Sequence, residues 1–232
     1  MNFRTLMTVS AVCASLLATG CGDSTATTDA APSTPPDQLV LTGSELPAGA
    51  KKVSIPDDQL RESMADFAGV QSDSTITPAE CKGPQLDLEA ASKAALSDSA
   101  VAAVVADTTV LSEFVAARPT DLSTFAEADA KCPKLSINSV IEGERVDSEV
   151  TVDMRKPPAA LNGIDAIATY STATATTATV PDAPVTTATY AGWATLRGTT
   201  VAVRVTSLSD TLDEVAAEKF FVDAVRKVKD AK

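Results

Sequence analysis

The stretch Arg145-Val-Asp-Ser-Glu-Val-Thr-Val-Asp-Met-Arg155 alternates apolar and polar side chains along its whole length. One face of this stretch carries the apolar residues Val146, Val150, Val152 and Met154. The opposite face carries Asp147, Glu149, Thr151, Asp153 and Arg155. A period of two predicts a β-strand with one face on a core and the other in water. Such half-exposed strands are typical of antiparallel sheets, since parallel sheets are covered on both faces.

Further strands are predicted on both sides of this stretch. They are Lys134–Glu142 before it, across Gly143, and Ile164–Ala178, Val185–Leu196 and Thr199–Leu208 after it. Arg197-Gly198 is expected to form the tight turn between the last two. In the final strand we expect Val201, Val203 and Val205 to point inward. Because no helical pattern separates these strands, neighbouring ones must pair antiparallel.

The C-terminal segment has the pattern of an amphipathic helix. Thr211-Leu-Asp-Glu214 fits a capping box, with acids in the first turn. An apolar stripe follows, made of Val215, Phe221, Val222, Val225 and Val228. Lysines at the end of the segment suit the negative end of the helix dipole. We expect this helix to cover one face of the sheet.

The first half of the chain mixes short helices and strands. An apolar strand or arm is expected at Leu39–Leu41, a strand at Lys51–Ile55, and a helix capped by Asp57 or Asp58 that buries Leu60, Met64 and Phe67 and ends at Gly69. Next we expect a helix at Leu86–Leu96 and two strands at Ala100–Ala106 and Thr109–Ala117, although the alanine-rich first strand could instead extend the helix. A short helix from Asp121 or Ser123 is expected to bury Leu122, Phe125, Ala128 and Ala130. The predicted fold class is α+β, with helices packed on a mainly antiparallel sheet in a single domain over 38–232.

The N-terminus has the layout of a secretory signal. Met1–Arg4 is positively charged, Leu6–Leu17 is apolar, and small residues precede Cys21. The apolar run is too short to cross a bilayer, which takes about 20 residues. Leu16-Leu-Ala-Thr-Gly-Cys21 resembles a bacterial lipoprotein box. That resemblance implies removal of residues 1–20, attachment of a diacylglyceryl lipid with palmitate-type chains to Cys21, and a place on the extracytoplasmic face of the cell membrane. The alternative is a plain signal peptide, with Cys21 incidental.

Residues 21–37 are predicted to be a lipidated, disordered linker. Gly22–Asp37 contains no large apolar residue, so burial cannot offset the entropy lost on ordering. Its threonine and proline content fits an O-glycosylated stalk or an unmodified spacer equally well.

The cysteines left after processing are Cys81 and Cys132. A lone pair in an exported protein predicts one disulfide. The alternative is two free or metal-binding thiols. The chain has no histidine, which excludes Ser-His-Asp and Cys-His triads, and two cysteines alone make a poor zinc site. We therefore expect no metal, no cofactor and no enzymatic activity.

The chain is acidic, with a formal net charge of −12. Loss of Arg4 with the signal makes it −13, so binding to nucleic acid is not expected. Glycine-rich phosphate loops, nucleophile elbows and calcium loops are absent from the sequence. Two sets of residues could still serve a site. Tyr170, Tyr190 and Trp193 could line a pocket or pack at the core, and Arg145, Arg155 and Arg204 could bind an anion or pair with acids on neighbouring strands.

Four short motifs carry a resemblance to a known family. They are Leu39-Val-Leu-Thr-Gly-Ser-Glu-Leu-Pro-Ala-Gly49, Pro78-Ala-Glu-Cys81, Lys131-Cys-Pro133, and Trp193 followed by Arg197-Gly198 before a final helix. In this order the chain resembles the actinobacterial sensor-type lipoproteins related to the extracellular domain of receptor-like Ser/Thr kinases. The resemblance implies an α+β domain with a disulfide and a cleft for an envelope ligand. The kinase domains have two disulfides, whereas this chain has cysteines for one, and no residue match defines the pocket.

Two functions follow from these patterns. The first is a lipid-anchored, non-enzymatic envelope protein that binds a small ligand or acts as a sensor-like domain. The second is an accessory envelope lipoprotein that acts only by docking onto another protein. A polar cleft would favour the first and a large flat apolar patch the second. An enzyme would need two buried carboxylates, or a buried lysine, converging in one cleft.

Overall fold

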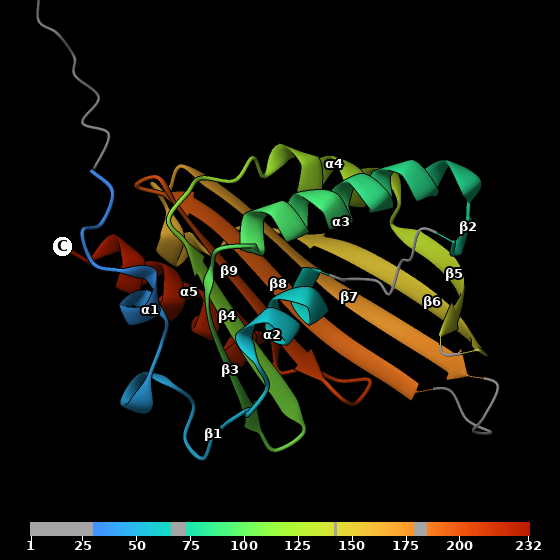
Figure 1. Cartoon of the computed structure of the whole chain (residues 1–232), viewed down its shortest axis with the longest axis horizontal. Coiled ribbons are helices and arrows are strands. Elements are labelled where there is room, and N and C mark those ends of the chain that lie inside the picture. The colour runs from blue at the N-terminus through green and yellow to red at the C-terminus, as the bar shows by residue number, and fades with distance from the viewer. Residues whose placement is uncertain (1–29, 66–72, 142, 179–184) are drawn as a thin grey trace, which may run out of the picture.

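The computed structural model describes residues 30–65, 73–141, 143–178 and 185–232 (Figure 1). In chain order the elements are α1 Pro36–Leu39, η1 Gly43–Glu45, β1 Lys51–Lys52, α2 Asp57–Ala65, β2 Thr75–Thr77, η2 Ala79–Cys81, α3 Lys82–Leu96, β3 Ala100–Ala106, β4 Thr109–Ala116, α4 Ser123–Lys131, β5 Lys134–Ile141, β6 Glu144–Arg155, η3 Ala159–Leu161, β7 Ala166–Ala178, β8 Val185–Leu196, β9 Thr199–Ser207 and α5 Glu214–Lys229. The predicted signal peptide, the lipid-attachment residue Cys21, and the helix positions Phe67 and Gly69 lie outside the described residues.

The described strands form one nine-stranded sheet in the order β1-β3-β4-β9-β8-β7-β6-β5-β2. Every neighbouring pair is antiparallel. The predicted α+β class is therefore confirmed. Residues 100–106 form a strand and do not extend the preceding helix, which settles the alternative left open there. Arg197 and Gly198 both have positive φ, 51° and 69°, as a two-residue hairpin turn requires.

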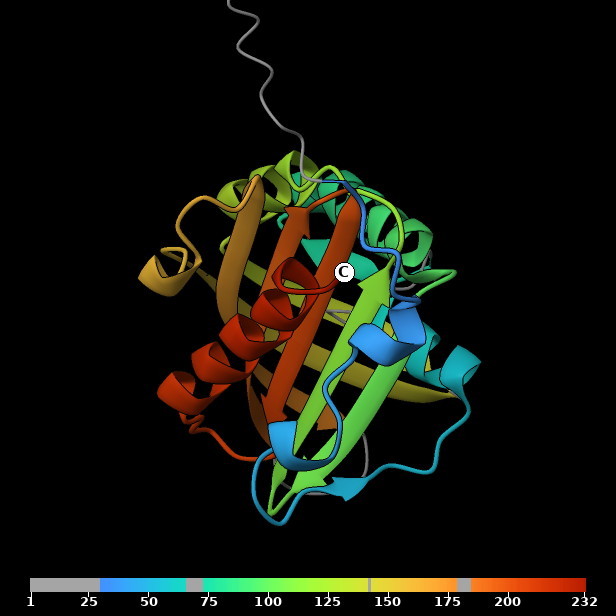
Figure 2. The same ribbon diagram turned by 90° about the vertical axis from the view of Figure 1, so that its left-hand side faces the viewer.

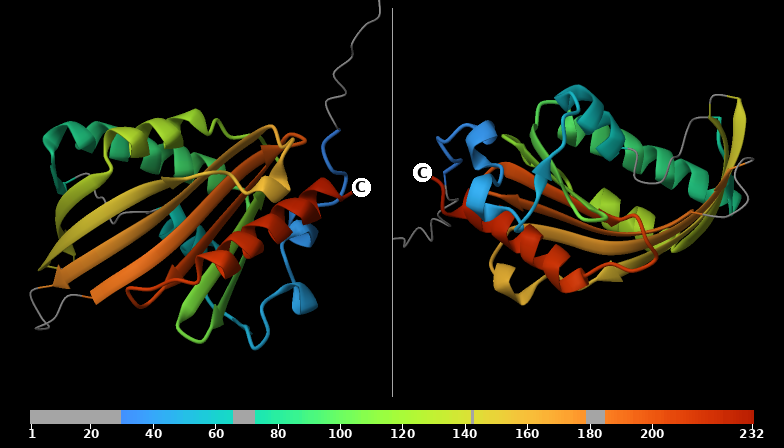
Figure 3. Two further views of the ribbon diagram at one scale, coloured as in Figure 1. Left: turned by 180° about the vertical axis from the view of Figure 1, so that it is seen from behind. Right: turned by 90° about the horizontal axis from the view of Figure 1, so that it is seen from below.

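Helices cover both faces of the sheet. Helix α5 packs along β8 and β9 on one face (Figure 2). The sheet is curved, and α3 lies inside the curve while α5 lies outside it (Figure 3). We call these the inner and outer faces. The outer core joins Val201, Val203 and Val205 to Phe221 and Val225 of α5, as expected.

Strand β9 is buried on both faces, whereas the sequence predicts burial of one face only. The sequence predicts that only Val201, Val203 and Val205 are buried there, but Ala202 between them is also only 1% exposed. Ala202 belongs to the inner core, where Phe114, Phe125 and Trp193 gather under α3 and α4. A strand in the middle of a sheet that helices cover on both sides has no solvent-exposed face. The outlying strand β6 keeps the predicted alternation more closely, with Val150 buried between the exposed Glu149 and Thr151.

The cap and stripe of α5 differ from the prediction in two places. Asp213, not Thr211, is the N-cap, and its carboxylate accepts a hydrogen bond from the Ala216 amide at 3.0 Å. Phe221, Val225 and Val228 are fully buried as expected, but Val215 is 82% exposed. Val215 lies within about 20° of the buried Val222 around the helix, so its exposure comes from its place in the first turn and not from its face.

The N-terminal arm is not a strand. Residues 36–39 form the single turn α1, and Leu39, Val40 and Leu41 are buried against the outer core. The Leu41 amide donates to Glu113 Oε2 at 2.7 Å, and Lys227 Nζ donates to the Val40 carbonyl at 2.8 Å. Two side chains from distant elements thus hold the arm in place. A strand is predicted at Lys51–Ile55, but the observed strand β1 has only two residues. The Val53 amide still donates to the Ala103 carbonyl, and the chain then turns toward α2.

The two ends of the described chain lie together (Figure 2). The Ser33 amide donates to the Lys232 carbonyl at 2.6 Å. The Arg197 guanidinium donates to the Ala30 carbonyl at 2.9 Å and to the Ala231 carbonyl at 2.6 Å. The last part of the predicted linker, residues 30–37, therefore contacts the folded part instead of standing free of it.

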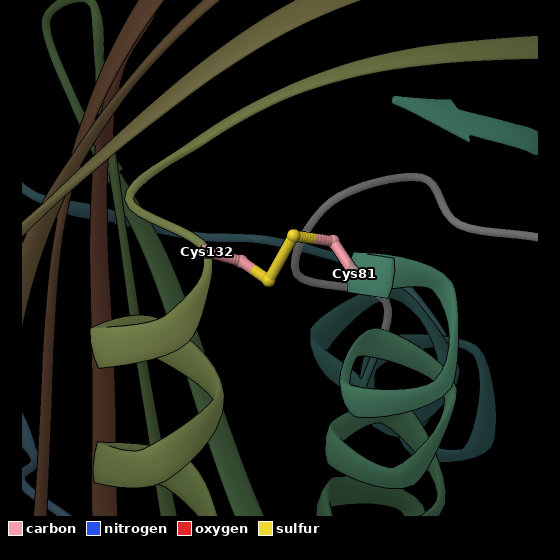
Figure 4. Close-up of a disulfide and its surroundings, with 2 residues drawn as sticks. All are labelled: Cys81 and Cys132. Carbon is pink, nitrogen blue, oxygen red and sulfur yellow. A yellow bond between two sulfur atoms is a disulfide. The ribbon is translucent and has the colours of Figure 1, made fainter. Parts of the chain in front are cut away.

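Cys81 and Cys132 form the predicted disulfide (Figure 4). Their Cα atoms are 5.8 Å apart, and the two residues are 1% and 2% exposed. Cys81 precedes α3 and Cys132 follows α4, so the bond ties the start of one helix to the end of another across the β3–β4 hairpin. Within α4, Phe125 and Ala128 are buried as expected, but Ala130 is exposed. Five residues from Phe125, it lies about 140° around the helix, away from the sheet.

Candidate functional site

The three polar aromatic residues are core residues. Trp193, Tyr170 and Tyr190 are 0%, 3% and 3% exposed. The Trp193 ring lies 4.6 Å from that of Phe125 on α4, and the Tyr190 ring lies 6.4 Å from that of Phe221 on α5. Burial raises the pKa of both tyrosines well above the usual value. Of the two roles that the sequence allows, packing is the one they have.

Two of the three strand arginines are held in ion pairs. Arg145 Nε donates to Asp147 at 3.0 Å, two residues along the same strand. Arg155 pairs with Glu214 of α5, and its Nε donates to Ser171 at 3.0 Å. The acid partners therefore come from the same strand and from a helix, not from neighbouring strands as expected. Neither residue marks an anion site.

The third arginine, Arg204, lines a hollow on the inner face. The hollow has a volume of about 240 Å³ and lies between the β1–α2 segment and strands β3, β4 and β9. Figure 1 shows α2 in front of these strands. The lining residues are Val53, Ile55, Leu60, Ala103, Val110, Ser112, Arg204 and Thr206. We call this hollow the inner pocket.

Strand register places the polar groups of the inner pocket side by side. Ser112 of β4 lies directly opposite Arg204 of β9, and Val110 lies opposite Thr206. The Thr206 hydroxyl is 3.1 Å from that of Thr189 on β8. Directly opposed side chains in antiparallel strands have Cβ atoms about 4.5–5.5 Å apart. One small chemical group can therefore reach Ser112 and Arg204 together.

A smaller hollow of about 130 Å³ lies between α3 and α4. Its lining residues are Pro84, Asp87, Ser123, Thr124, Glu127, Ala128 and Lys131. Lys131 is 3.9 Å from Glu127 one turn earlier on the same helix. This hollow is smaller than the inner pocket, and its charged side chains are of both signs and mostly exposed. It is therefore the weaker candidate for a ligand site.

Two acidic side chains are buried, and they lie on opposite faces of the sheet. Glu113 is 0% exposed and faces the outer core beside Leu41, where burial raises its pKa to about 8. Asp129 of α4 is 4% exposed and faces the inner core, where burial raises its pKa to about 7. The sheet separates the two carboxyl groups. They do not form the converging pair that acid–base catalysis needs.

In the described residues, no group of three or more Cys, Asp and Glu side chains is placed to hold a metal ion. No helix in that part of the chain is long and apolar enough to cross a membrane.

Comparisons with known proteins place the chain in no characterised family. No family model matches it, and no curated protein matches it. Among solved structures, it is similar to the X-ray structure of an uncharacterized protein from Mycobacterium smegmatis, described as the ortholog of Rv0999. That match has 17% sequence identity and a TM-score of 0.45, and it covers 81% of this chain and 91% of the other.

The sequence indicates Arg204 as a candidate site residue. It predicts neither the pocket around Arg204 nor the burial of Glu113 and Asp129. Val53, Leu60 and Val110 come from three separate elements, and nothing in the sequence indicates that they meet. For Glu113 a signal was present. It alternates with Leu111 and Val115, which face the outer core, and an acid is out of place among such residues. Asp129 gives no such signal, because a short helix can hide one acid at the edge of its apolar stripe.

Proposed function

We propose that this chain is an exported, lipid-anchored envelope protein whose folded part binds a small ligand without transforming it. The observation that carries the ligand-binding part is the inner pocket. Ligand sites are usually concave, mostly apolar, and lined by a few polar groups that fix orientation. The inner pocket has five aliphatic lining residues and three polar ones, of which Ser112 and Arg204 lie directly opposite each other.

The chemistry of the inner pocket favours binding over catalysis. Arg204 is the one charged residue among the eight that line it, and a guanidinium stays protonated at any physiological pH. It cannot serve as a general base for the Ser112 hydroxyl. Glu113, next to Ser112 in the chain, points to the other face of the sheet and holds the N-terminal arm.

The anchoring part of the proposal is supported by the sequence before residue 22. A short apolar run closed by small residues and Cys21 resembles a lipoprotein box, and two acyl chains hold a protein on a membrane stably. The described chain begins beside the C-terminus, where the Ser33 amide donates to the Lys232 carbonyl. The resemblance to actinobacterial sensor-type lipoproteins supports the same role.

The docking alternative has no specific observation in its favour. The large apolar side chains that are well exposed in the described residues come from different segments: Ile55, Val140, Met154, Val185, Leu208 and Val215. Scattered exposed apolar residues are normal on a protein surface. Ligand binding by the inner pocket is therefore the better supported of the two functions.

Filling the inner pocket should abolish binding of a small apolar probe. We expect 1-hexanol, added to the mature chain with Cys21→Ser so that no lipid competes, to shift the methyl NMR signals of Val53, Leu60 and Val110. Val110→Trp should remove the shifts of Val53 and Leu60, because the indole takes the volume that the probe would occupy.

The matched control is Val185→Trp, at an exposed position of β8 that does not line the pocket. This variant should leave the hexanol shifts unchanged. Hexanol shifts that are absent, or that persist in Val110→Trp at an unchanged melting temperature, would rule out the pocket as a ligand site.

A further inference from the structure

The polar groups of the inner pocket are gathered on its floor. The floor is a row of side chains across three strands, in which Ala103 lies opposite Ser112 and Ser112 lies opposite Arg204. The next residue in this row is Ala191 of β8. Both register neighbours of Arg204, Ser112 and Ala191, are small residues. Thr206, two residues further along β9, adds a hydroxyl to the same end of the pocket.

The walls of the inner pocket are aliphatic. Val53, Ile55 and Leu60 approach from the β1–α2 segment, and Val110 lies on the floor beside the polar row. The volume of about 240 Å³ exceeds the roughly 150 Å³ of a cavity that holds benzene, and it falls short of the usual range for drug-sized ligands. The space therefore suits a short alkyl chain or a single ring.

From these features we infer that the ligand is a small amphiphile with an anionic head, a carboxylate or a phosphate, bound by Arg204 and Ser112 with its apolar part against Val53, Leu60 and Val110. This inference rests on the proposed function and adds the chemical class of the ligand. Arginine presents five donors in a planar fork that matches these anions. With five donors it can keep contacts inside the protein and still bind a head group. Arg204 is close enough to Tyr170 to affect the titration of the phenol.

The positive charge of Arg204 should make the pocket prefer a ligand with an anionic head group. A cationic head would be repelled by Arg204, and a neutral head would gain only the apolar contacts. The full chain carries −12 and the chain without residues 1–20 carries −13, so the long-range field opposes anions and the preference must come from local contacts. Salt at about 0.15 M shortens the range of that field to about 8 Å and leaves a buried contact largely intact.

The test compares three probes with one hexyl chain: hexanoate, 1-hexanol and hexylammonium. Binding is measured at pH 7 in 0.15 M salt by methyl NMR on the mature chain with Cys21→Ser. We expect hexanoate to bind at least about tenfold more tightly than hexanol, as a charge-assisted bond contributes, and hexylammonium not to bind. Hexyl phosphate replaces hexanoate in a second arm and shows which of the two anions is preferred.

Arg204→Gln should lower the affinity for hexanoate to that for hexanol and leave the affinity for hexanol unchanged. Arg204→Lys, which keeps the charge, should keep a preference for hexanoate. The control is Arg145→Gln, which removes the same charge from an exposed site on β6 and should change neither affinity. Circular dichroism melting checks that each variant is folded.

The outcomes distinguish ligand binding by the inner pocket from selection of an anionic head group by Arg204. If hexanol and hexanoate bind equally and Arg204→Gln has no effect, the pocket binds ligands but the anion inference is wrong. If no probe shifts any pocket methyl, the proposed function itself fails. If folded Arg204→Lys binds hexanol best, the charge of Arg204 does not select the head group, and the inference is overturned.

Discussion

Replacing Phe221 by alanine is expected to lower the free energy of unfolding by about 3–5 kcal/mol, as deletion of a buried aromatic ring does. Phe221 is fully buried on the side of α5 that faces the sheet. Its ring lies directly on Gly192 of β8, where an added Cβ would come within 2.7 Å of the ring. Gly192 has no side chain of its own to occupy the space that the ring would leave.

The matched control for this variant is Val215→Ala on the same helix. Val215 is 82% exposed, so its truncation should change stability by no more than about 0.5 kcal/mol. Urea unfolding measures both variants, with a lower midpoint and an unchanged slope expected for Phe221→Ala. A loss below 1 kcal/mol, or an equal loss in the control, would show that α5 does not pack on the sheet as described.

Removing the disulfide should cost about 4 kcal/mol, since the bond closes a loop of roughly 50 residues in the unfolded chain. The bond is buried and joins α3 to α4 on the inner face, with a sequence separation of 51. The double variant Cys81→Ala, Cys132→Ala is compared with the parent chain by urea unfolding. A cost of this size is a large part of the ~5–15 kcal/mol that typically stabilises a domain.

A reducing agent provides the control for the disulfide. It should destabilise the parent chain by about as much as the double substitution does, and it should leave the double variant unchanged. If the parent chain unfolds at the same urea concentration with and without reductant, the bond contributes nothing to stability and this prediction is wrong.

The sequence predicts elements best where local pattern and tertiary environment agree. In β6 the alternation holds around Val150, with Glu149 and Thr151 exposed, because that strand lies away from the middle of the sheet. It fails at Met154, which the pattern places on the core face but which is 39% exposed. In β9 the same reasoning finds the three valines but misses Ala202. An alanine between valines carries no sign that a second layer of helices will cover it.

Caps and helix ends were harder to predict for a physical reason. Thr211 and Asp213 are both good N-cap residues, and only the path of the chain leaving β9 decides between them. The stripe from Phe221 to Val228 does not depend on this choice, because it is fixed by contact with β8 and β9.

The candidate site could be predicted only in part. Arg204 stands out in the sequence as an arginine on a strand, yet Arg145 and Arg155 stand out equally and are held in ion pairs. What distinguishes Arg204 is the register that sets it opposite Ser112 and the segment after β1 that walls the hollow. Both are long-range arrangements, which local patterns do not encode.

Attachment of the chain to a membrane through Cys21, in an oxidising compartment, is tested most directly by the intact mass of the protein extracted from the membranes of its native host. We expect residues 21–232 with a diacylglyceryl group on Cys21 and two hydrogens fewer than free thiols at Cys81 and Cys132 would give. A soluble, unprocessed chain of 232 residues with reduced cysteines would contradict the account.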